Sequence, residues 1–336
     1  MSFQTLESMY RRLADYPFKH LRLIWHGGEP LTLGIEFYEK ALALQKDYLQ
    51  GRIVINSIQT NGTLINNDWC DFFKRNKFSV GVSLDGDKTI NSDRVYPNGE
   101  EAFADIINGI HLMRINHVNF GILAVISNAI IGHEKEFYLF HRTLTESLRI
   151  NLVVPYGIGK KNVGFSYEEY MDSISNSLIK LYEIWKKDRS GTSLFSIQPF
   201  SEIVKSLINC HVHSCSFSEN GCASVLSLSH DGRVYSCGRF SSEEQFLMGN
   251  INENSFDEIL TSPFGIRRAE RKKRISIECS GCEFFRICHG GCAHESFALK
   301  GDYYKRTPFC QIYKSLFAHI KQDLIKMGIA IKDSAS

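Results

Sequence analysis

The 336-residue chain lacks several features that would each place it in a particular class of protein. It has no apolar run long enough to cross a bilayer. Met1 to Arg12 lacks the charged-then-apolar pattern of a secretion signal, so we predict a cytoplasmic protein without membrane attachment. A net charge of only +2 argues against nucleic acid as a partner. Cysteine is scarce ahead of Cys215, where only Cys70 and Cys210 occur.

The length of the chain exceeds what one hydrophobic core usually supports, so two domains are expected. Up to about residue 155, short β-branched runs alternate with helical patterns. This alternation predicts an α/β fold with a parallel sheet and crossover helices. The predicted strands are Leu21–Trp25, Ile53–Ile58, Phe78–Ser83, Phe120–Ile126 and Ile150–Val154. The predicted helices cover residues 35–49, 67–75, 101–114 and 134–148.

Polar residues and glycines follow four of the predicted strands, in the segments Gly27–Pro30, Gln59–Gly62, Ser83–Gly86 and Ser127-Asn128. Because the carboxyl ends of parallel strands meet at one edge of a sheet, we expect a ligand-binding rim there. The alternative is that these residues simply form the turns between strand and helix. Four such ends in succession favour the rim.

The predicted division of the chain is a sheet domain (1–165), bridging helices (166–210) and a cysteine-rich domain (211–336). Ser166 and Glu169 form a capping box at the start of one bridging helix, and a second helix is expected near Ser201–Ile208. Short alternating runs around Asp231-Gly232 predict a β-hairpin. A closing helix is expected after Cys310.

Eight of the ten cysteines occur at defined spacings after residue 214. They are Cys215, Cys222, Cys237, Cys279, Cys282, Cys288, Cys292 and Cys310. Ten cysteines in a cytoplasmic chain favour metal or redox ligation over disulfides, and eight thiolates suffice for two iron–sulfur clusters. Structural zinc is the alternative, but zinc sites usually use two tight pairs, and only Cys279 and Cys282 form one.

The spacing from Cys222 through Gly232 to Cys310 resembles the SPASM domain, and Cys215 adds the eighth ligand of its two-cluster form. The segments Gly28-Glu29-Pro30, Gln59-Thr60-Asn61-Gly62-Thr63 and Ser83-Leu84-Asp85-Gly86 resemble the rim motifs of radical S-adenosylmethionine (SAM) enzymes. Together the resemblance covers nearly the whole chain. It implies a partial (β/α)6 barrel, here without its first strand, followed by a SPASM domain with two auxiliary [4Fe–4S] clusters.

The resemblance also implies roles for individual residues. Gly27, Gly28 and Glu29 would hold the SAM amino group through main-chain oxygens, and Ser83 and Arg94 would contact its carboxylate and ribose. The first auxiliary cluster would bind Cys215, Cys222, Cys237 and Cys292. The second would bind Cys279, Cys282, Cys288 and Cys310. Cys292 would thus bind the first cluster, although the cysteines just before it in the sequence bind the second. One ligand crosses over in the same way in two-cluster ferredoxins.

Radical SAM enzymes bind a third, catalytic [4Fe–4S] cluster through Cys-x3-Cys-x2-Cys, and this motif is absent from the sequence. Without this motif, the chain is expected not to cleave SAM. Without a preceding strand, Leu21–Trp25 would be an unpaired apolar sheet edge. We therefore favour a start inside a longer reading frame that supplies the motif. A natural pseudo-enzyme that binds peptide or relays electrons is the alternative.

Two branches of the family fit the sequence. Anaerobic sulfatase maturases oxidise a Cys or Ser side chain, and commonly have an aspartate base directly after the cysteine that corresponds to Cys237. This chain has Gly238 there, although Glu243, Glu244 or Asp231 could substitute. The base itself therefore stays unassigned.

The other branch modifies ribosomally made peptides by hydrogen abstraction, and Trp25–Leu31 and Ser57–Leu64 resemble this branch more closely. We therefore expect an oxidoreductase that matures a peptide or protein substrate, with flavodoxin or ferredoxin as electron donor. His211, His213 and His289 are surface residues or lie close to cluster ligands. Arg267–Arg274 is a solvated helix face or a docking site for an acidic leader peptide.

Overall fold

The computed structural model describes residues 1–154, 167–189, 195–209, 214–218, 221–241 and 243–331. The chain forms two compact units. The sheet unit comprises Ser2–Asn151 and Asp188–Ile197. The cysteine unit comprises Leu152–Lys187 and Gln198–Ser336, to which Met1 is also assigned. The predicted domain boundaries near residues 165 and 210 lie outside the described residues and stay predictions.

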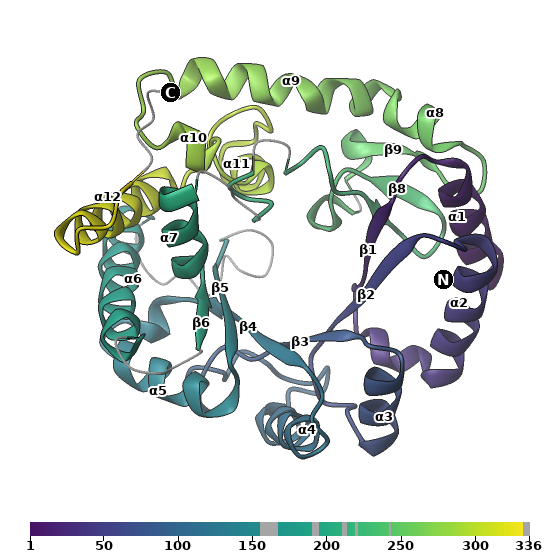
Figure 1. The fold of residues 1–336 in the computed structure, drawn as a ribbon, viewed down its shortest axis with the longest axis horizontal. Helices are drawn as coiled ribbons and strands as arrows, with labels where there is room; N and C mark the ends of the chain where they lie inside the picture. Colours follow the sequence, from purple (N-terminus) through teal and green to yellow (C-terminus); the bar gives the residue numbers. More distant parts are fainter. Residues whose placement is uncertain (155–166, 190–194, 210–213, 219–220, 242, 332–336) are drawn as a thin grey trace. The chain divides into compact units, whose positions relative to one another are not determined.

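The sheet unit is built on a six-stranded sheet whose strands follow one another in chain order (Figure 1). Neighbouring strands from the first to the fourth pair in parallel, which confirms the predicted α/β fold with a parallel sheet. The strands are β1 (His20–Trp25), β2 (Ile53–Thr60), β3 (Ser79–Ser83), β4 (Phe120–Ile126), β5 (Ser147–Leu152) and β6 (Ser196–Gln198).

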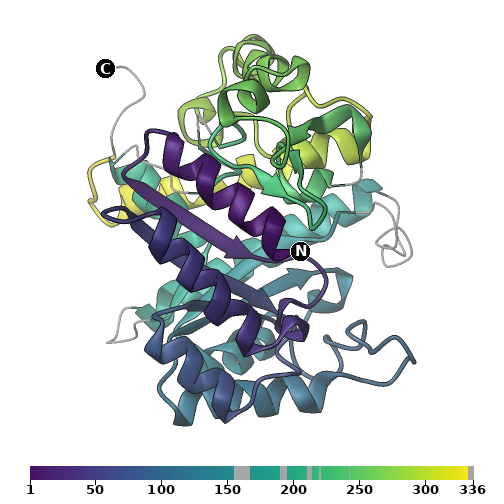
Figure 2. The ribbon, with the colours of Figure 1, turned by 90° about the vertical axis from the view of Figure 1, so that its right-hand side faces the viewer.

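Five helices of this unit lie on the outer side of the curved sheet (Figure 1). Ser2 caps the first of them, because its hydroxyl accepts a hydrogen bond from Thr5 N at 3.1 Å. The helices are α1 (Phe3–Asp15), α2 (Ile35–Tyr48), α3 (Asn67–Arg75), α4 (Phe103–Ile115) and α5 (Glu134–Leu144). Figure 2 shows α1 and α2 packed side by side.

An aromatic cluster fixes the segment that follows β1. Tyr38 of α2 is fully buried, and its ring contacts Trp69 and Phe72 of α3 with centroid separations of 5.7 and 6.0 Å. Each such ring contributes about 1.5–3 kcal/mol through burial. The Tyr38 hydroxyl donates to the Pro30 carbonyl at 2.9 Å. The core thus positions the turn after β1.

Two predicted elements differ from the structure, and one strand was not predicted. The helix predicted over residues 134–148 ends at Leu144, and the strand predicted over Ile150–Val154 begins three residues earlier, at Ser147. The reason is the alternation of exposed and buried residues from Ser147 to Leu152, a period-two pattern that the helix prediction overran. β6 was not predicted, because three residues are too short for a periodic signal. Its Ser196 N–H donates to the Glu146 carbonyl at 2.8 Å.

The cysteine unit contains a small antiparallel sheet and several helices. The turn at Asp231-Gly232 joins two of its strands, which confirms the predicted hairpin. The strands are β7 (Ser227–Leu228), β8 (Arg233–Tyr235) and β9 (Leu247–Asn250). The helices are α6 (Tyr167–Arg189), α7 (Phe200–Asn209), α8 (Phe256–Leu260), α9 (Pro263–Glu278), α10 (Phe285–Cys288), α11 (Ala293–Lys300) and α12 (Cys310–Lys326).

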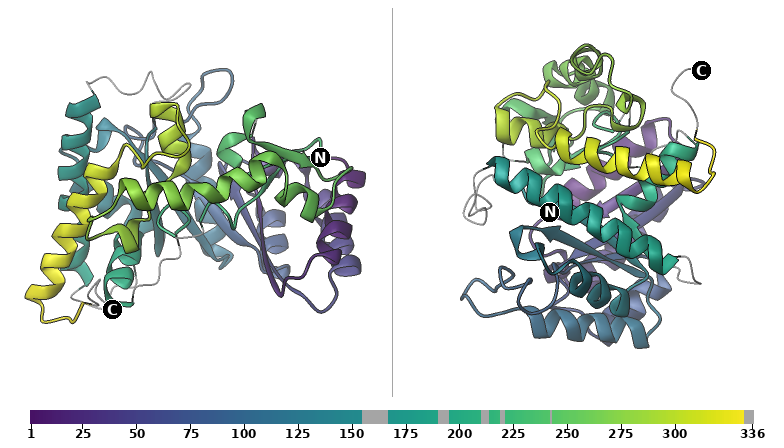
Figure 3. Two further views of the ribbon diagram at one scale, coloured as in Figure 1. Left: turned by 90° about the horizontal axis from the view of Figure 1, so that it is seen from above. Right: turned by 90° about the vertical axis from the view of Figure 1, so that its left-hand side faces the viewer.

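Polar side chains join α6 and α12, which lie side by side in Figure 3. Asp323 accepts hydrogen bonds from Tyr182 Oη and Lys186 Nζ, both at 2.8 Å. His319 Nε2 lies 2.7 Å from Glu183 Oε1. The predicted closing helix is confirmed and begins at a candidate cluster ligand. In the described part of the chain, no helix combines the length and hydrophobicity needed to cross a bilayer.

Candidate functional site

The turn after β1 opens the candidate rim of the sheet unit. Gly27 and Gly28 have φ values of 97° and 54°, a backbone region that favours glycine. A Cβ atom added to either residue would meet nothing within 4 Å. A ligand can therefore approach the main chain of this turn closely, which is what a main-chain contact to an amino group requires.

Glu29 ties this turn to the end of β2. Its Oε1 accepts hydrogen bonds from Leu31 N at 3.0 Å and Thr60 Oγ1 at 2.7 Å, and its Oε2 accepts one from Asn61 N at 2.7 Å. Its carbonyl oxygen accepts a hydrogen bond from Thr32 Oγ1 at 2.7 Å. The side chain therefore organises the rim, a function that sequence reasoning missed.

A second set of contacts joins the ends of β2, β3 and β4. Asp85 accepts hydrogen bonds from Val125 N at 2.8 Å and Arg94 Nη2 at 2.7 Å, and its other oxygen lies 2.7 Å from Arg94 Nε. Gln59 Nε2 donates to Ser83 Oγ at 3.0 Å. Ser83 and Arg94 are thus held in place by neighbouring rim residues. Their contacts with a cofactor stay predictions.

His141 of α5 lies beneath this rim and is completely buried. Its Nδ1 is 2.9 Å from the Phe137 carbonyl oxygen, and its Nε2 is 3.4 Å from that of Leu84. Burial lowers the pKa of the imidazole below its usual value, because the charged form loses its hydration. No local sequence signal distinguishes this histidine from a surface residue of a helix.

In the cysteine unit, electrostatic interactions link the four thiols of the first predicted cluster. Cys237 interacts with Cys222 and Cys215, and Cys292 interacts with Cys222. Cys237 follows β8, and Cys292 is the N-cap of α11. Gly221 packs against Cys215 so closely that an added Cβ would lie 2.0 Å from the Cys215 carbonyl oxygen. Loops from distant parts of the chain thus bring these thiols to one region.

The four thiols of the second predicted cluster interact in the same way. Cys288, at the end of α10, interacts with Cys279, Cys282 and Cys310. Cys279 caps the C-terminus of α9, and its N–H donates to the Ile275 carbonyl at 2.9 Å. Cys282 N donates to the Cys279 carbonyl at 3.1 Å. Helix ends and tight turns therefore fix all four positions, since Cys310 is the first residue of α12.

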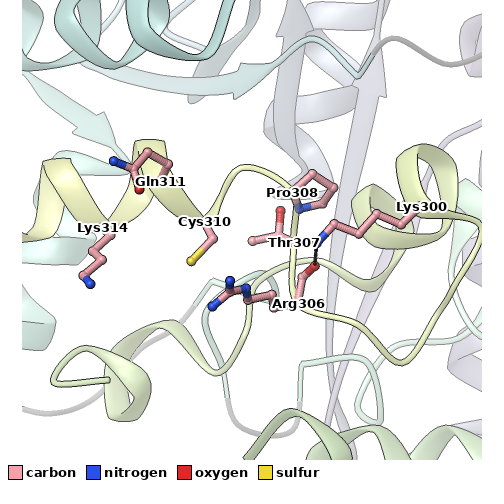
Figure 4. A pocket seen from close by; sticks show the side chains of 7 residues that line it. All are labelled: Lys300, Arg306, Thr307, Pro308, Cys310, Gln311 and Lys314. Carbon is pink, nitrogen blue, oxygen red and sulfur yellow. Dashed lines mark hydrogen bonds between the residues drawn. The ribbon is translucent and has the colours of Figure 1, made fainter. Parts of the chain in front are cut away.

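Cys310 also lines a cavity of about 320 Å³ (Figure 4). Lys300 Nζ donates to the Arg306 carbonyl at 3.3 Å, which fixes one wall. The other lining residues are Thr307, Pro308, Gln311 and Lys314. Three of the lining residues, Lys300, Arg306 and Lys314, carry cationic side chains.

The loop from Cys288 to Cys292 separates the two thiol sets. Its three internal residues, His289, Gly290 and Gly291, have φ values of 47°, 80° and 72°. An added Cβ on Gly290 would lie 2.3 Å from Ile275 Cγ2, and one on Gly291 would lie 2.3 Å from Thr307 Cγ2. This reversal allows Cys288 and Cys292 to interact with different sets although they are only four residues apart.

Two arginines of the basic run on α9 hold the loops that carry cysteines. Arg268 Nη2 donates to the Ala223 carbonyl at 3.2 Å, and Arg271 Nε donates to that of Tyr303 at 2.9 Å. Both arginines are buried. The run is therefore neither a wholly solvated face nor a free docking surface, because part of it binds the main chain beside Cys222.

Two of the three carboxylates considered as bases, Asp231 and Glu244, are engaged with Arg233 of β8. Asp231 Oδ2 and Glu244 Oε1 lie 2.7 and 2.9 Å from nitrogens of Arg233. Near the first thiol set, Arg239 is the notable side chain, because its Nη1 donates to Cys292 Sγ at 3.9 Å. Sequence reasoning assigned this arginine no role. His211, His213 and Cys210 lie outside the described residues.

Two of the candidate ligand thiols, Cys288 and Cys292, have a strongly raised pKa. Burial raises the pKa of Cys288 and Cys292 to about 12 in each case, so metal binding has to release these protons. Among the described residues, no three His, Cys, Asp or Glu side chains are arranged to hold a single metal ion. A [4Fe–4S] cluster needs a wider arrangement, since each thiolate binds a different iron. The separate groups of four thiols fit that requirement.

Comparison with known proteins connects both units to one group of enzymes. Residues 215–283 match the SPASM family, an iron–sulfur cluster-binding domain. A cysteine-type anaerobic sulfatase-maturating enzyme of Clostridium perfringens is 30% identical over 99% of this chain and 90% of its own length. A serine-type enzyme of Klebsiella aerogenes is 31% identical over 89% of this chain and 75% of its own length.

Solved structures show the same similarity. Native anSMEcpe with bound AdoMet has a TM-score of 0.85 and 26% sequence identity, and the match covers 97% of this chain and 90% of that one. The same protein with bound AdoMet and the Kp18Cys peptide has a TM-score of 0.84 over the same shares of the two chains. The likeness therefore extends over the rim and the thiol sites together.

Proposed function

The chain belongs to the family of anaerobic sulfatase-maturating enzymes, which are radical SAM proteins with a SPASM domain, and we propose that it oxidises a cysteine or serine side chain of a sulfatase. The observation that carries this proposal is 30% identity to a sulfatase-maturating enzyme over 99% of the chain. This identity supports the sulfatase-maturase branch, which the sequence motifs favoured less than the branch that modifies ribosomally made peptides. The preference for a ribosomally made peptide substrate stays unconfirmed.

The oxidation removes two hydrogens from the substrate side chain. A serine CH2–OH group becomes an aldehyde by loss of two electrons and two protons. A cysteine CH2–SH group becomes a thioaldehyde in the same way, and water then releases hydrogen sulfide to leave the aldehyde. When bound, AdoMet would supply the radical that takes one hydrogen atom, the auxiliary clusters would accept the remaining electron, and a base that stays unassigned would take the remaining proton. The protein has to hold these groups and exclude water.

We propose that the two thiol sets hold two auxiliary [4Fe–4S] clusters. The first set is Cys215, Cys222, Cys237 and Cys292, and the second is Cys279, Cys282, Cys288 and Cys310. The interactions of Cys237 and Cys292 within one set, and of Cys288 within the other, support this division. For the sheet unit, the same proposal includes a partial (β/α)6 barrel that lacks its first strand.

At the rim, Gly27, Gly28 and Glu29 would bind the AdoMet amino group. The open main chain of the two glycines supports this role. The Glu29 carbonyl also accepts from Thr32, so the two glycines are the stronger candidates. Ser83 and Arg94 would contact the carboxylate and ribose from positions fixed by their rim partners.

The experiment combines metal analysis with a peptide assay. The anaerobically reconstituted protein should bind about eight irons per chain, and a synthetic sulfatase peptide should bind in the presence of AdoMet. Radical generation also requires a Cys-x3-Cys-x2-Cys segment, which the printed sequence does not contain. The oxidation assay therefore uses a protein in which such a segment is joined to this chain, with dithionite or reduced flavodoxin as the reductant.

Loss of two hydrogens from a serine peptide, detected by mass spectrometry, supports the proposal. Zinc without iron would refute the cluster assignment. Full iron loading with peptide binding but without oxidation would indicate an electron-relay or peptide-binding protein instead.

A further inference from the structure

Arg239 occupies the short 3-10 helix Gly238–Phe240 directly after the candidate ligand Cys237. Its Nη1 donates to Sγ of Cys292 at 3.9 Å, within the range of hydrogen bonds to sulfur. Its guanidinium also interacts electrostatically with Cys237 and Glu295. One arginine thus faces two thiols of the first set, which come from segments more than fifty residues apart in the sequence.

The surroundings of this contact are well fixed. Phe240, the residue after Arg239, is buried and lies 4.0 Å from Phe246 between ring centroids. On the other side, Glu295 of α11 is buried and its Oε2 accepts from Thr307 Oγ1 at 2.5 Å. The Arg239 side chain itself is exposed, but its backbone and the Cys292 thiol that it contacts both belong to packed elements.

We infer that Arg239 raises the reduction potential of the first auxiliary cluster by donating a hydrogen bond and a positive charge to the Cys292 thiolate. Reduction adds one negative charge to an iron–sulfur cluster, so a nearby cation stabilises the reduced state more than the oxidised one. Hydrogen bonds to the ligand sulfurs act in the same direction. Arginine suits this role because it stays charged at every physiological pH.

This inference rests on the proposed function, because it takes Cys292 as a ligand of the first cluster. It adds a residue that tunes electron acceptance without touching the substrate. An arginine that raises the potential would make the cluster a better acceptor for the electron left on the oxidised side chain. Arg239 is therefore a positioning and tuning residue rather than a catalytic one.

The matched control is Arg233 of β8, the strand that precedes the 3-10 helix with Arg239. Arg233 is engaged with Asp231 and Glu244, on the exposed surface of β8. Arg233→Gln changes the net charge of the protein by the same amount as Arg239→Gln. A difference between the two variants therefore reports the local contact with Cys292 and not the charge of the whole molecule.

The test is an anaerobic redox titration of the reconstituted protein, followed by electron paramagnetic resonance, with Cys292→Ala used to identify the first cluster. Arg239→Gln should lower the equilibrium constant for reduction at least about tenfold, a shift of about 59 mV to more negative potential. Arg233→Gln should change it less than about twofold, and Arg239→Lys should fall between the parent and Arg239→Gln.

An unchanged potential in an iron-replete Arg239→Gln protein would overturn the inference and leave the proposed function intact. Arg239→Met is the second neutral variant, and loss of iron from both neutral variants would overturn the inference in favour of a structural role. Two unaltered cluster signals in Cys292→Ala would instead refute the proposed ligand set, and the inference with it.

Discussion

The two units build their candidate sites in different ways. In the sheet unit, Glu29 and Asp85 accept several hydrogen bonds each and join the ends of neighbouring strands. In the cysteine unit, helix ends, glycine turns and buried arginines bring distant loops together. The rim residues are held by hydrogen bonds within the protein, whereas under the proposed function the thiols would gain their final partners from metal. The comparison predicts that the units respond differently to the same treatment.

Removal of iron should produce the largest difference. Metal binding contributes directly to the folding of small metal-binding domains, because the unfolded chain has no preformed site. We expect chelation to abolish hydrogen-exchange protection around Cys288 and Cys292, while strands β2 and β3 stay protected. Peptide-resolved hydrogen exchange measures both units in one sample. Equal loss of protection in the two units would contradict the comparison.

Arg271→Met should be the most harmful single substitution on α9. It removes hydrogen bonds to the Tyr303 and Lys305 carbonyls and leaves the first of them buried without that partner. The expected cost is about 3 kcal/mol of unfolding free energy, together with loss of iron from the second cluster. Denaturation under anaerobic conditions and iron analysis measure the two effects.

Lys273→Met is the control for this prediction, because Lys273 is exposed on the same helix. It should change the free energy of unfolding by less than about 0.5 kcal/mol. Similar effects of both substitutions would mean that the basic run acts through its overall charge.

Glu29→Gln should loosen the rim but leave iron content unchanged. The carboxylate accepts three hydrogen bonds, whereas the NH2 group of the new amide is itself a donor and would face the donors of Leu31, Thr60 or Asn61. A cost of about 2 kcal/mol is expected, which corresponds to about 30-fold faster exchange of the Asn61 amide. Glu36→Gln, at an exposed position of α2, should leave that exchange rate unchanged.

The smallest effect is a pH dependence carried by His141. Its folded-state pKa lies below the unfolded value of 6.5, so the unfolded chain binds more protons between these two values. Stability of the sheet unit is therefore fully present above pH 6.5 and falls as pH decreases, by at most about 1.4 kcal/mol per pH unit. Thermal unfolding from pH 7.5 to 5.5 measures this slope.

His141→Asn should flatten that dependence, and His111→Gln, at an exposed position of α4, should retain it. A slope that survives in His141→Asn would assign the pH dependence to other groups.

Sequence reasoning located the sheet, the hairpin and the closing helix, because each has a local periodic or turn signal. It missed β6, whose three residues are defined only by their neighbours in the sheet. It also placed the boundary between α5 and β5 too late, since apolar residues suit both elements there. The rim segments were found because glycines follow strands, but the function of the Glu29 side chain depends on a strand 24 residues further along.

By itself, the sequence determined which chemistry is available: eight thiols at SPASM spacings and glycine-containing turns after parallel strands. Only the tertiary structure decided which groups meet. It separated Cys288 from Cys292 through three residues with positive φ, turned Arg268 and Arg271 inward, and brought Arg239 to Cys292. The physical reason is that spacing and periodicity act over a few residues, whereas these contacts join segments that become neighbours only when the chain packs.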